Sequence, residues 1–381
     1  MTRPHGVVSI VAGLVAGALL MTACSSSSDS GGSGKASESA SNPYPALTAT
    51  VNKLLQRPTT IGITEPIKAA IPTGKTIAFI QCGSPICASL GNDLTDAAQQ
   101  VNWKVSRINA GVTAETIKAA WDQAVTSKPD AVVTSGTPRT LFNSELAQLA
   151  AMKTPVIDLT TADSAGDGLT QVYGGPDQYS TQGKNIADYM LVSSGSTTVN
   201  ALSVTIPAYP NVALVGKGVS AEIKAQCASC SADSLDVPVT SIGSDLPSRI
   251  TSYLSAHPKV NWVYVGFADM VTGLPAALNA AGLGSVKIVT LSTNPTIATY
   301  MKNGQNLVMA TGFDVTEMMW RSVDYLARTW TGSSTAQNTD EARLPSWFVT
   351  KDNLPSATEN FPYVAEYKSQ YEALWKAAGG N

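Results

Sequence analysis

Residues 76–103 read TIAFIQCGSPICASLGNDLTDAAQQVNW, and the rest of the chain repeats the pattern of this stretch. TIAFIQC is a short apolar run, which predicts a buried strand. Leu90, Leu94, Ala98 and Val101 then follow at steps of three and four residues, which is the apolar stripe of a helix. A strand followed by a helix predicts the start of an α/β fold.

The alternation of apolar strands and helical stripes continues in two series. The first series predicts strands at 76–82, 104–110, 130–136 and 154–161. After a polar, glycine-rich passage at 161–175, the second series predicts strands at 201–206, 232–239, 260–267, 286–292 and 306–313, then a long helix over 315–330 and a short strand at 346–350. Helices between successive strands imply right-handed crossovers and parallel sheets.

We therefore expect an α/β protein with two doubly wound parallel-sheet lobes and a ligand cleft between them. Ligands bind outside the carboxyl ends of such strands, and lobe interfaces favour pockets. Crossings between the lobes are expected near Thr161, near Gly312 and over 331–345. The expected division is a signal peptide at 1–23, a lipid-anchored flexible tether and lead-in at 24–74, a first lobe at 75–161 with 313–331, a second lobe at 162–312 with 345–351, and a C-terminal tail at 352–381.

The N-terminal residues have the features of an export signal. MTRPHG is basic, VVSIVAGLVAGALL has no charge, and small residues precede Cys24. Cys24 directly after Thr-Ala resembles a bacterial lipobox, in which the cysteine is acylated and becomes the mature N-terminus; ordinary cleavage nearby is the alternative. Because the Ser/Gly-rich residues 25–42 suit a flexible tether, we expect an exported protein held by lipid on Cys24 at the outer face of the membrane.

Charge and histidine content exclude several classes of function. Residues 1–23 contain Arg3 and no acid, so their removal changes the net charge from −3 to −4, and nucleic acid is not expected as a partner. His257 is the one histidine of the mature chain, which excludes a zinc site built from several histidines. We expect no metal and no cofactor.

Four further cysteines form two close pairs, Cys82 with Cys87 and Cys227 with Cys230. Export to an oxidising compartment favours disulfides, and four cysteines allow three connectivities. Proximity favours 82–87 and 227–230. The alternative for Cys227-Ala-Ser-Cys230 is a thioredoxin-like redox pair, but that motif needs a helix opening at the cysteines, and here the helical stretch precedes them.

Four stretches, in order, resemble one family. Residues 76–103 are similar to its opening strand, ligand loop and helix; 128–161 to its P-D-A-apolar-apolar and P-V-apolar patterns; 260–282 to its N-D-x-M-A-x-G region; and 286–320 to its G-F-D-G, A-T-x-A-Q and E-M ending. The family is that of the type I periplasmic binding proteins, in the ribose-binding-like group of ABC-importer receptors. The resemblance implies a monomeric receptor that closes two hinged lobes over one small molecule and presents it to an ABC permease.

The positions that bind sugars in that family differ here. They fall on hydroxyl or aromatic residues: Thr160 and Thr161, Phe267, Ser292 and Phe313. Because sugars are held by charged and amide groups that bond their hydroxyls, we expect instead a neutral or weakly charged ligand with an apolar or ring face. The candidate ligand-binding residues are Ser84, Ser135, Thr160, Tyr209, Phe267, Asp269, Ser292, Phe313 and Asp314.

Structural alternatives compete with these assignments. Phe267 and Phe313 could belong to the lobe cores, Tyr209 could cover its own loop, and Asp269 could cap a helix. Asp158 could contact ligand or be satisfied by backbone donors.

Two other functions are open at the level of sequence. A sensor that presents its ligand-bound state to a membrane signalling receptor would have the same fold. An exported enzyme is disfavoured, because the chain has no Gly-rich phosphate loop and no nucleophile elbow.

Overall fold

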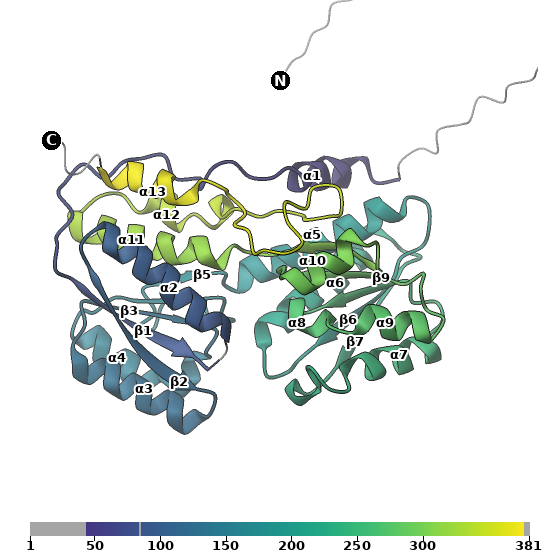
Figure 1. Ribbon diagram of the computed structural model, residues 1–381, viewed down its shortest axis with the longest axis horizontal. Coiled ribbons are helices and arrows are strands. Elements are labelled where there is room, and N and C mark those ends of the chain that lie inside the picture. The colour runs from purple at the N-terminus through teal and green to yellow at the C-terminus, as the bar shows by residue number, and fades with distance from the viewer. Residues whose placement is uncertain (1–42, 84, 377–381) are drawn as a thin grey trace, which may run out of the picture. The chain divides into compact units, whose positions relative to one another are not determined.

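The structure, a computed structural model, describes residues 43–83 and 85–376 and contains two five-stranded sheets (Figure 1). The strand order is β2-β1-β3-β4-β5 in the first sheet and β10-β9-β8-β6-β7 in the second. All pairings between these strands are parallel. The predicted fold class is therefore confirmed.

The first sheet is built from the strands that the apolar runs predict, with one addition. Its strands are β1 (Thr76–Cys82), β2 (Lys104–Gly111), β3 (Ala131–Ser135), β4 (Val156–Leu159) and β5 (Gln171–Tyr173). Its helices are α2 (Pro85–Gln100), α3 (Ala114–Ser127), the 3-10 helix η1 (Arg139–Leu141) and α4 (Asn143–Ala151). The strand interiors are buried because helices cover both faces of the sheet.

The second sheet repeats this arrangement. Its strands are β6 (Asn200–Thr205), β7 (Ser231–Asp236), β8 (Trp262–Val265), β9 (Lys287–Leu291) and β10 (Leu307–Thr311). Its helices are α5 (Pro176–Ser194), α6 (Pro210–Gln226), η2 (Val239–Ser241), α7 (Leu246–Ala256), α8 (Ala268–Val271), α9 (Leu274–Ala280) and α10 (Pro295–Lys302). Gly273 has a positive φ of 78°, which separates α8 from α9.

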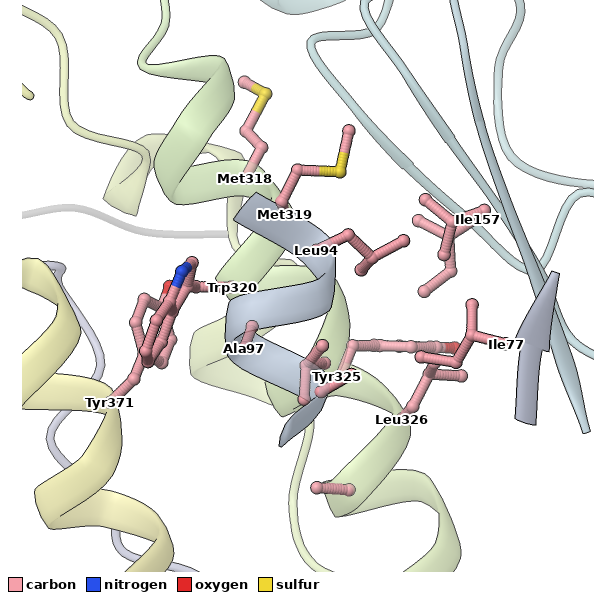
Figure 2. Packing of buried hydrophobic residues seen from close by; sticks show 14 of the residues in the cluster. Ile77, Leu94, Ala97, Ile157, Met318, Met319, Trp320, Tyr325, Leu326 and Tyr371 are labelled. Carbon is pink, nitrogen blue, oxygen red and sulfur yellow. The ribbon is translucent and has the colours of Figure 1, made fainter. Parts of the chain in front are cut away.

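Helix α11 (Val315–Thr331) forms the centre of the first-lobe core and is buried from Glu317 to Arg328. Figure 2 shows its side chains packed with residues of β1, β4, α2 and α13. Its charged residues form two buried ion pairs, Glu317–Arg321 at 3.0 Å and Asp324–Arg328 at 2.7 Å. Pairing is what allows such charges in a core, because an unpaired buried charge is costly.

The expected crossing near Thr161 is displaced. Strand β5 pairs with β4, so the first sheet extends to Tyr173 and the chain passes to the second lobe at Gly174 and Gly175, just before α5. The sequence missed β5 because three residues in a polar passage give no measurable period. The expected strand at 346–350 consists of isolated bridges, from Ser346 to Phe313 and from Val349 to Ala310.

Both ends of the described part of the chain, from residue 43 and up to residue 376, are packed on the lobes. Helix α1 (Pro45–Leu55) packs on α5 of the second lobe, whereas Ile61, Ile63 and Ile67 lie in the first-lobe core. The described part of the expected tether and lead-in, residues 43–74, therefore packs against both lobes. After α12 (Ala336–Thr339) and η3 (Glu341–Arg343), the tail ends in α13 (Tyr367–Lys376), which lies beside α11 in the first lobe (Figure 1).

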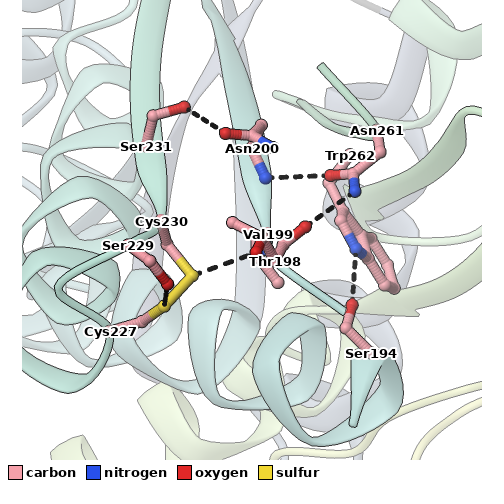
Figure 3. Close-up of a disulfide and its surroundings, with 10 residues drawn as sticks. All are labelled: Ser194, Thr198, Val199, Asn200, Cys227, Ser229, Cys230, Ser231, Asn261 and Trp262. Atoms are coloured by element: carbon pink, nitrogen blue, oxygen red, sulfur yellow. Dashed lines mark hydrogen bonds between the residues drawn. A yellow bond between two sulfur atoms is a disulfide. The ribbon is translucent and has the colours of Figure 1, made fainter. Parts of the chain in front are cut away.

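Both expected cysteine pairs are disulfides. Cys82–Cys87 joins the end of β1 to α2, and Cys227–Cys230 follows the last residue of α6. Near the second disulfide, the Val199 amide donates a hydrogen bond to Cys230 Sγ at 3.4 Å, and the Asn200 amide donates one to Asn261 Oδ1 at 2.9 Å (Figure 3). The helix precedes this pair, as the sequence predicts, so the geometry differs from that of a redox motif at a helix start. Each disulfide lies within one lobe.

Candidate functional site

The carboxyl ends of the two sheets present matching hydroxyl residues. Thr160 directly follows β4 and Ser292 directly follows β9, and their φ angles are 55° and 56°. The Thr160 amide donates to the Tyr173 carbonyl at 2.8 Å, and the Ser292 amide donates to the Thr311 carbonyl at 2.6 Å. A left-handed backbone is uncommon for such residues and concentrates at functional sites. Equivalent strand ends therefore have the same unusual geometry.

A cavity of about 100 Å³ lies where the carboxyl end of the first sheet meets the start of α6. We call it the interlobe cavity; its lining residues are Gly136, Pro138, Thr160, Thr161, Ala162, Asp163, Tyr209, Pro210 and Asn211. Two of the predicted ligand-binding residues, Thr160 and Tyr209, are among them. Ser135 lies next to it, because its hydroxyl is hydrogen-bonded to the Thr160 hydroxyl at 3.0 Å.

Asn211 connects the two walls of the interlobe cavity. Its Nδ2 donates to the Thr160 carbonyl at 3.4 Å and to the Tyr179 hydroxyl at 3.2 Å. Burial raises the pKa of Tyr179 to about 12, so this hydroxyl stays neutral and serves as a fixed polar group. First-lobe and second-lobe residues therefore touch directly beside the cavity.

Phe313 lies behind this contact. Its ring meets the edge of the Tyr179 ring at 5.4 Å, and it packs against the cores of both lobes. It is not a lining residue of the interlobe cavity. The structure therefore places Phe313 at the crossing between the lobes.

The second-lobe wall continues into an aromatic pair. The Tyr209 ring, 38% exposed, lies 6.0 Å from the Phe267 ring in an edge-on arrangement. Phe267 is half-buried against the second-lobe core at the start of α8. These rings give the wall an apolar surface next to the cavity.

The remaining predicted second-lobe residues, Ser292 and Asp269, do not line the interlobe cavity. Ser292 is exposed. Asp269 is also exposed and accepts a hydrogen bond from Asn294 Nδ2 at 3.1 Å; it is not the residue that caps α8.

Asp314 has a structural role in the first lobe. Its two carboxylate oxygens accept hydrogen bonds from the Glu317 amide at 3.2 Å and the Tyr363 amide at 2.7 Å. It thereby caps α11 and holds the C-terminal tail. Burial is the largest cause that raises its pKa, to about 6. No local pattern in the sequence indicates that the C-terminal tail binds this residue. Asp314 is outside the cavity lining.

Thr161, which falls on a sugar-binding position of the family, also lines the cavity, whereas sequence reasoning missed three polar groups at this site: Asp163, Asn211 and Arg139. The Arg139 amide donates to Asp163 at 2.8 Å, its guanidinium lies 3.4 Å from Asp163 and 3.2 Å from Asp167, and the Thr161 hydroxyl donates to Asp163 at 3.3 Å. The signal for Asn211 was its place at the end of PAYPN, in the first turn of α6. Ser84 and Cys24 lie outside the described residues.

Asp158 is the most unusual polar residue near the cavity. Its side chain is fully buried on β4, and neither carboxylate oxygen has a hydrogen-bond partner in the described structure. Burial raises its pKa well above the usual range, and the charge of Asp163 adds to this effect. The Leu159 amide and the Thr161 hydroxyl act in the opposite direction and lower this pKa.

Within residues 43–83 and 85–376, no group of three or more His, Cys, Asp or Glu residues could hold a metal ion. In the same part of the chain, no helix combines the length and hydropathy needed to cross a membrane.

Comparison with known proteins decides the family. Residues 76–334 match the family described as periplasmic binding protein domain. The chain belongs to this family. No curated protein sequence matches the chain.

Solved structures share the fold of this periplasmic binding protein. An ABC sugar transporter subunit from Rhodobacter sphaeroides has 17% identity and a TM-score of 0.62, covering 74% of this chain and 99% of its own. A periplasmic ribose ABC transporter protein from Conexibacter woesei has 15% identity and a TM-score of 0.62, covering 75% and 95%. A carbohydrate transporter protein from Acidothermus cellulolyticus, in complex with myo-inositol, has 18% identity and a TM-score of 0.60, covering 80% and 99%.

Proposed function

We propose that this periplasmic binding protein captures one small molecule between its lobes and presents it to an ABC permease. The observation that carries the proposal is the interlobe cavity, with walls from the carboxyl end of the first sheet and from the start of α6, joined by Asn211. A ligand that contacts both walls favours the closed arrangement of the lobes, as in hinge closure of such receptors. Family membership and the sugar-transporter neighbours support the receptor role.

The proposed ligand is neutral or weakly charged and has an apolar or ring face. The lining supports this, since it contains the hydroxyls of Thr160 and Thr161, the Asn211 amide and the Tyr209 ring, with Asp163 as its one charged residue, and Tyr209 contacts the Phe267 ring. The interlobe cavity of about 100 Å³ is smaller than typical ligand pockets, so we expect the lobes to separate before a ring enters. Simple hexoses and pentoses would leave hydroxyls short of partners, at roughly 1–3 kcal/mol for each buried unpaired group.

We further propose that the protein is a monomer anchored to the outer face of the membrane through acylated Cys24. The sequence around Cys24 supports this placement. Two acyl chains give stable attachment where one does not.

A thermal-shift screen tests the ligand class. Compounds with a ring face should raise the unfolding temperature, whereas ribose and glucose should not. Phe267→Ala should reduce that rise, because it removes part of the apolar wall, and Phe313→Ala should reduce it by loosening the lobe crossing. A surface control, Met152→Ala, lies at the end of α4, on the side of the strands' amino ends, and should leave the rise unchanged. Strong stabilisation by ribose that survives Phe267→Ala would contradict the proposed ligand class.

A further inference from the structure

The N-terminal segment connects the two lobes at a place where the sequence predicts no crossing. On the second-lobe side, α1 packs on α5, and the Leu54 carbonyl accepts a hydrogen bond from the Phe348 amide at 2.7 Å. On the first-lobe side, Ile61 is buried in the core, and its amide donates to Gln370 Oε1 at 3.0 Å. The chain therefore passes from the second lobe to the first within residues 55–60.

The C-terminal tail makes another crossing beside this one. Tyr363 lies in the second-lobe core and Val364 lies in the first-lobe core, so the tail crosses at a single peptide bond. Farther along the tail, Gln370 on α13 donates to the Thr59 carbonyl at 2.9 Å, which holds the tail and the N-terminal segment together. These two connections come in addition to the crossings that the sequence predicts.

Tyr363 is held through its amide, its carbonyl and its ring. The amide donates to the Asp314 carboxylate at 2.7 Å, and the carbonyl accepts a hydrogen bond from Arg57 Nε at 3.0 Å. Arg57 also donates to the Pro362 carbonyl at 2.8 Å, and its guanidinium lies 5.3 Å from the centre of the Trp347 ring. The Tyr363 ring meets the Trp347 ring edge-on at 5.7 Å. We call these residues the hinge clasp: Arg57, Asp314, Trp347, Pro362 and Tyr363.

The hinge clasp leaves little free chain between the lobes. In the N-terminal segment, only Pro58 separates Arg57, which binds the second-lobe residue Tyr363, from Thr59, which is bonded to α13 of the first lobe. One extended residue spans at most about 3.6 Å, so the lobes can hardly move apart at this point while these hydrogen bonds are kept. They can still rotate, because hinge movements need changes at only a few residues.

The hinge clasp lies toward one edge of the second sheet. Val349, two residues after Trp347, pairs with Ala310 of β10, which is an edge strand. In the first sheet, the chain leaves for the second lobe from the edge strand β5, and the opposite edges of the two sheets are β2 and β7. A rotation about the hinge clasp therefore moves the ends of β2 and β7 more than it moves the elements beside the clasp.

We infer that the hinge clasp is the pivot of the protein: the lobes turn about Tyr363, and the N-terminal segment and the tail limit how far the cleft opens. This inference goes beyond the proposed function, because it concerns a movement that the protein makes with or without a ligand. It also makes residues 55–60 a part of the hinge, so a change in this segment alters the movement of the lobes.

Distances between spin labels in the ligand-free, full-length protein test the inference. Labels are carried by unnatural amino acids, which leaves the disulfides intact. One pair replaces Val112 and Val239, which are exposed and follow β2 and β7. The other pair replaces Lys53 on α1 and Ser369 on α13, which are exposed on the two sides of the hinge clasp.

Pulsed electron spin resonance then gives a distribution of distances for each pair. The distribution between positions 112 and 239 should be about twofold broader than the one between positions 53 and 369, because rotation displaces distant points more than points near the pivot. A distribution at 112 and 239 that is no broader than the one at 53 and 369 would overturn the inference.

Replacing Arg57 tests whether the clasp restrains the movement. Arg57→Ala should broaden the distribution between positions 53 and 369, because it removes the hydrogen bonds to Pro362 and Tyr363. Arg57→Lys should broaden it less, since an ammonium group keeps the charge but lacks the fork of donors. The control is Arg249→Ala, which removes an exposed guanidinium that pairs with Asp245 one turn away on α7 and should keep the wild-type width.

An unchanged distribution in Arg57→Ala, or the same broadening in Arg249→Ala, would overturn the inference. Circular dichroism and urea unfolding establish that each variant is folded. If Arg57→Ala does not fold, Gln370→Ala decides instead: it removes no charge, breaks the bonds of α13 to Thr59 and Ile61, and should broaden the same distribution. Because no ligand is present, these results are independent of the proposed ligand class.

Discussion

Neutralising Asp314 should change how the stability of the protein depends on pH. Asp314 is the buried acid that caps α11 and holds the tail through Tyr363. Its pKa is raised from 3.8 to about 6, chiefly by burial, with Glu317 adding to the rise. Between these values the folded protein binds more protons at this residue than the unfolded chain does. The free energy of unfolding therefore falls as pH rises through this range.

The size of the effect follows from the two pKa values. A difference of about two pKa units corresponds to about 3 kcal/mol, of which about 2 kcal/mol is lost between pH 4 and pH 7. Asn at position 314 does not titrate, so Asp314→Asn should lack this contribution. The difference in unfolding free energy, wild type minus variant, should fall by about 2 kcal/mol from pH 4 to pH 7.

Urea unfolding of both proteins at four pH values, followed by tryptophan fluorescence, measures this difference. Asp352→Asn, which removes an exposed acid from the tail region, should keep the wild-type pH dependence and serves as the control. If Asp314→Asn and the wild type changed in parallel from pH 4 to pH 7, the buried cap would not be the titrating group that we describe.

Three further predictions concern the anchor, the contact between the lobes and the core. Cys24→Ala should move the protein from the detergent phase to the aqueous phase, and equal partition of both proteins would contradict the lipid anchor. Asn211→Ala should widen the distribution of distances between spin labels on the two lobes of the ligand-free protein; an unchanged distribution would show that the contact with Thr160 does not hold the lobes. Arg321→Met should destabilise the fold by about 3–5 kcal/mol in urea unfolding, because it leaves Glu317 buried without its cation.

The long strands of both sheets could be predicted from the sequence, because each of these strands and each helix has its own pattern of apolar residues. Each long strand is an apolar run between turns, and each covering helix has its own stripe, as at Leu90 and Leu94. Strand β5 has no such signal, since Gln171, Val172 and Tyr173 become a strand only by pairing with β4. The same holds for Ile61, Ile63 and Ile67, which have no helical period and are buried by a core formed far along the chain.

The site was only partly predictable for the same reason. Thr160 directly follows β4 and Tyr209 lies in the short loop between β6 and α6, so their place at the sheet edge follows from topology. Asp314 also follows a strand, but the amide that binds it belongs to Tyr363, which no local pattern connects to it. Asp158 looked like any acid near a strand end; only the packed structure shows that its oxygens have no partner.

Native mass spectrometry of the purified protein tests the central claim most directly. If the protein is a receptor that closes over one ligand, the spectrum should contain a species with one small molecule per chain, and Phe267→Ala should reduce its share. Gentle unfolding should release that molecule for identification. A spectrum of the bare chain alone, unchanged after incubation with a broad library of small molecules, would contradict the claim that the cleft binds a ligand.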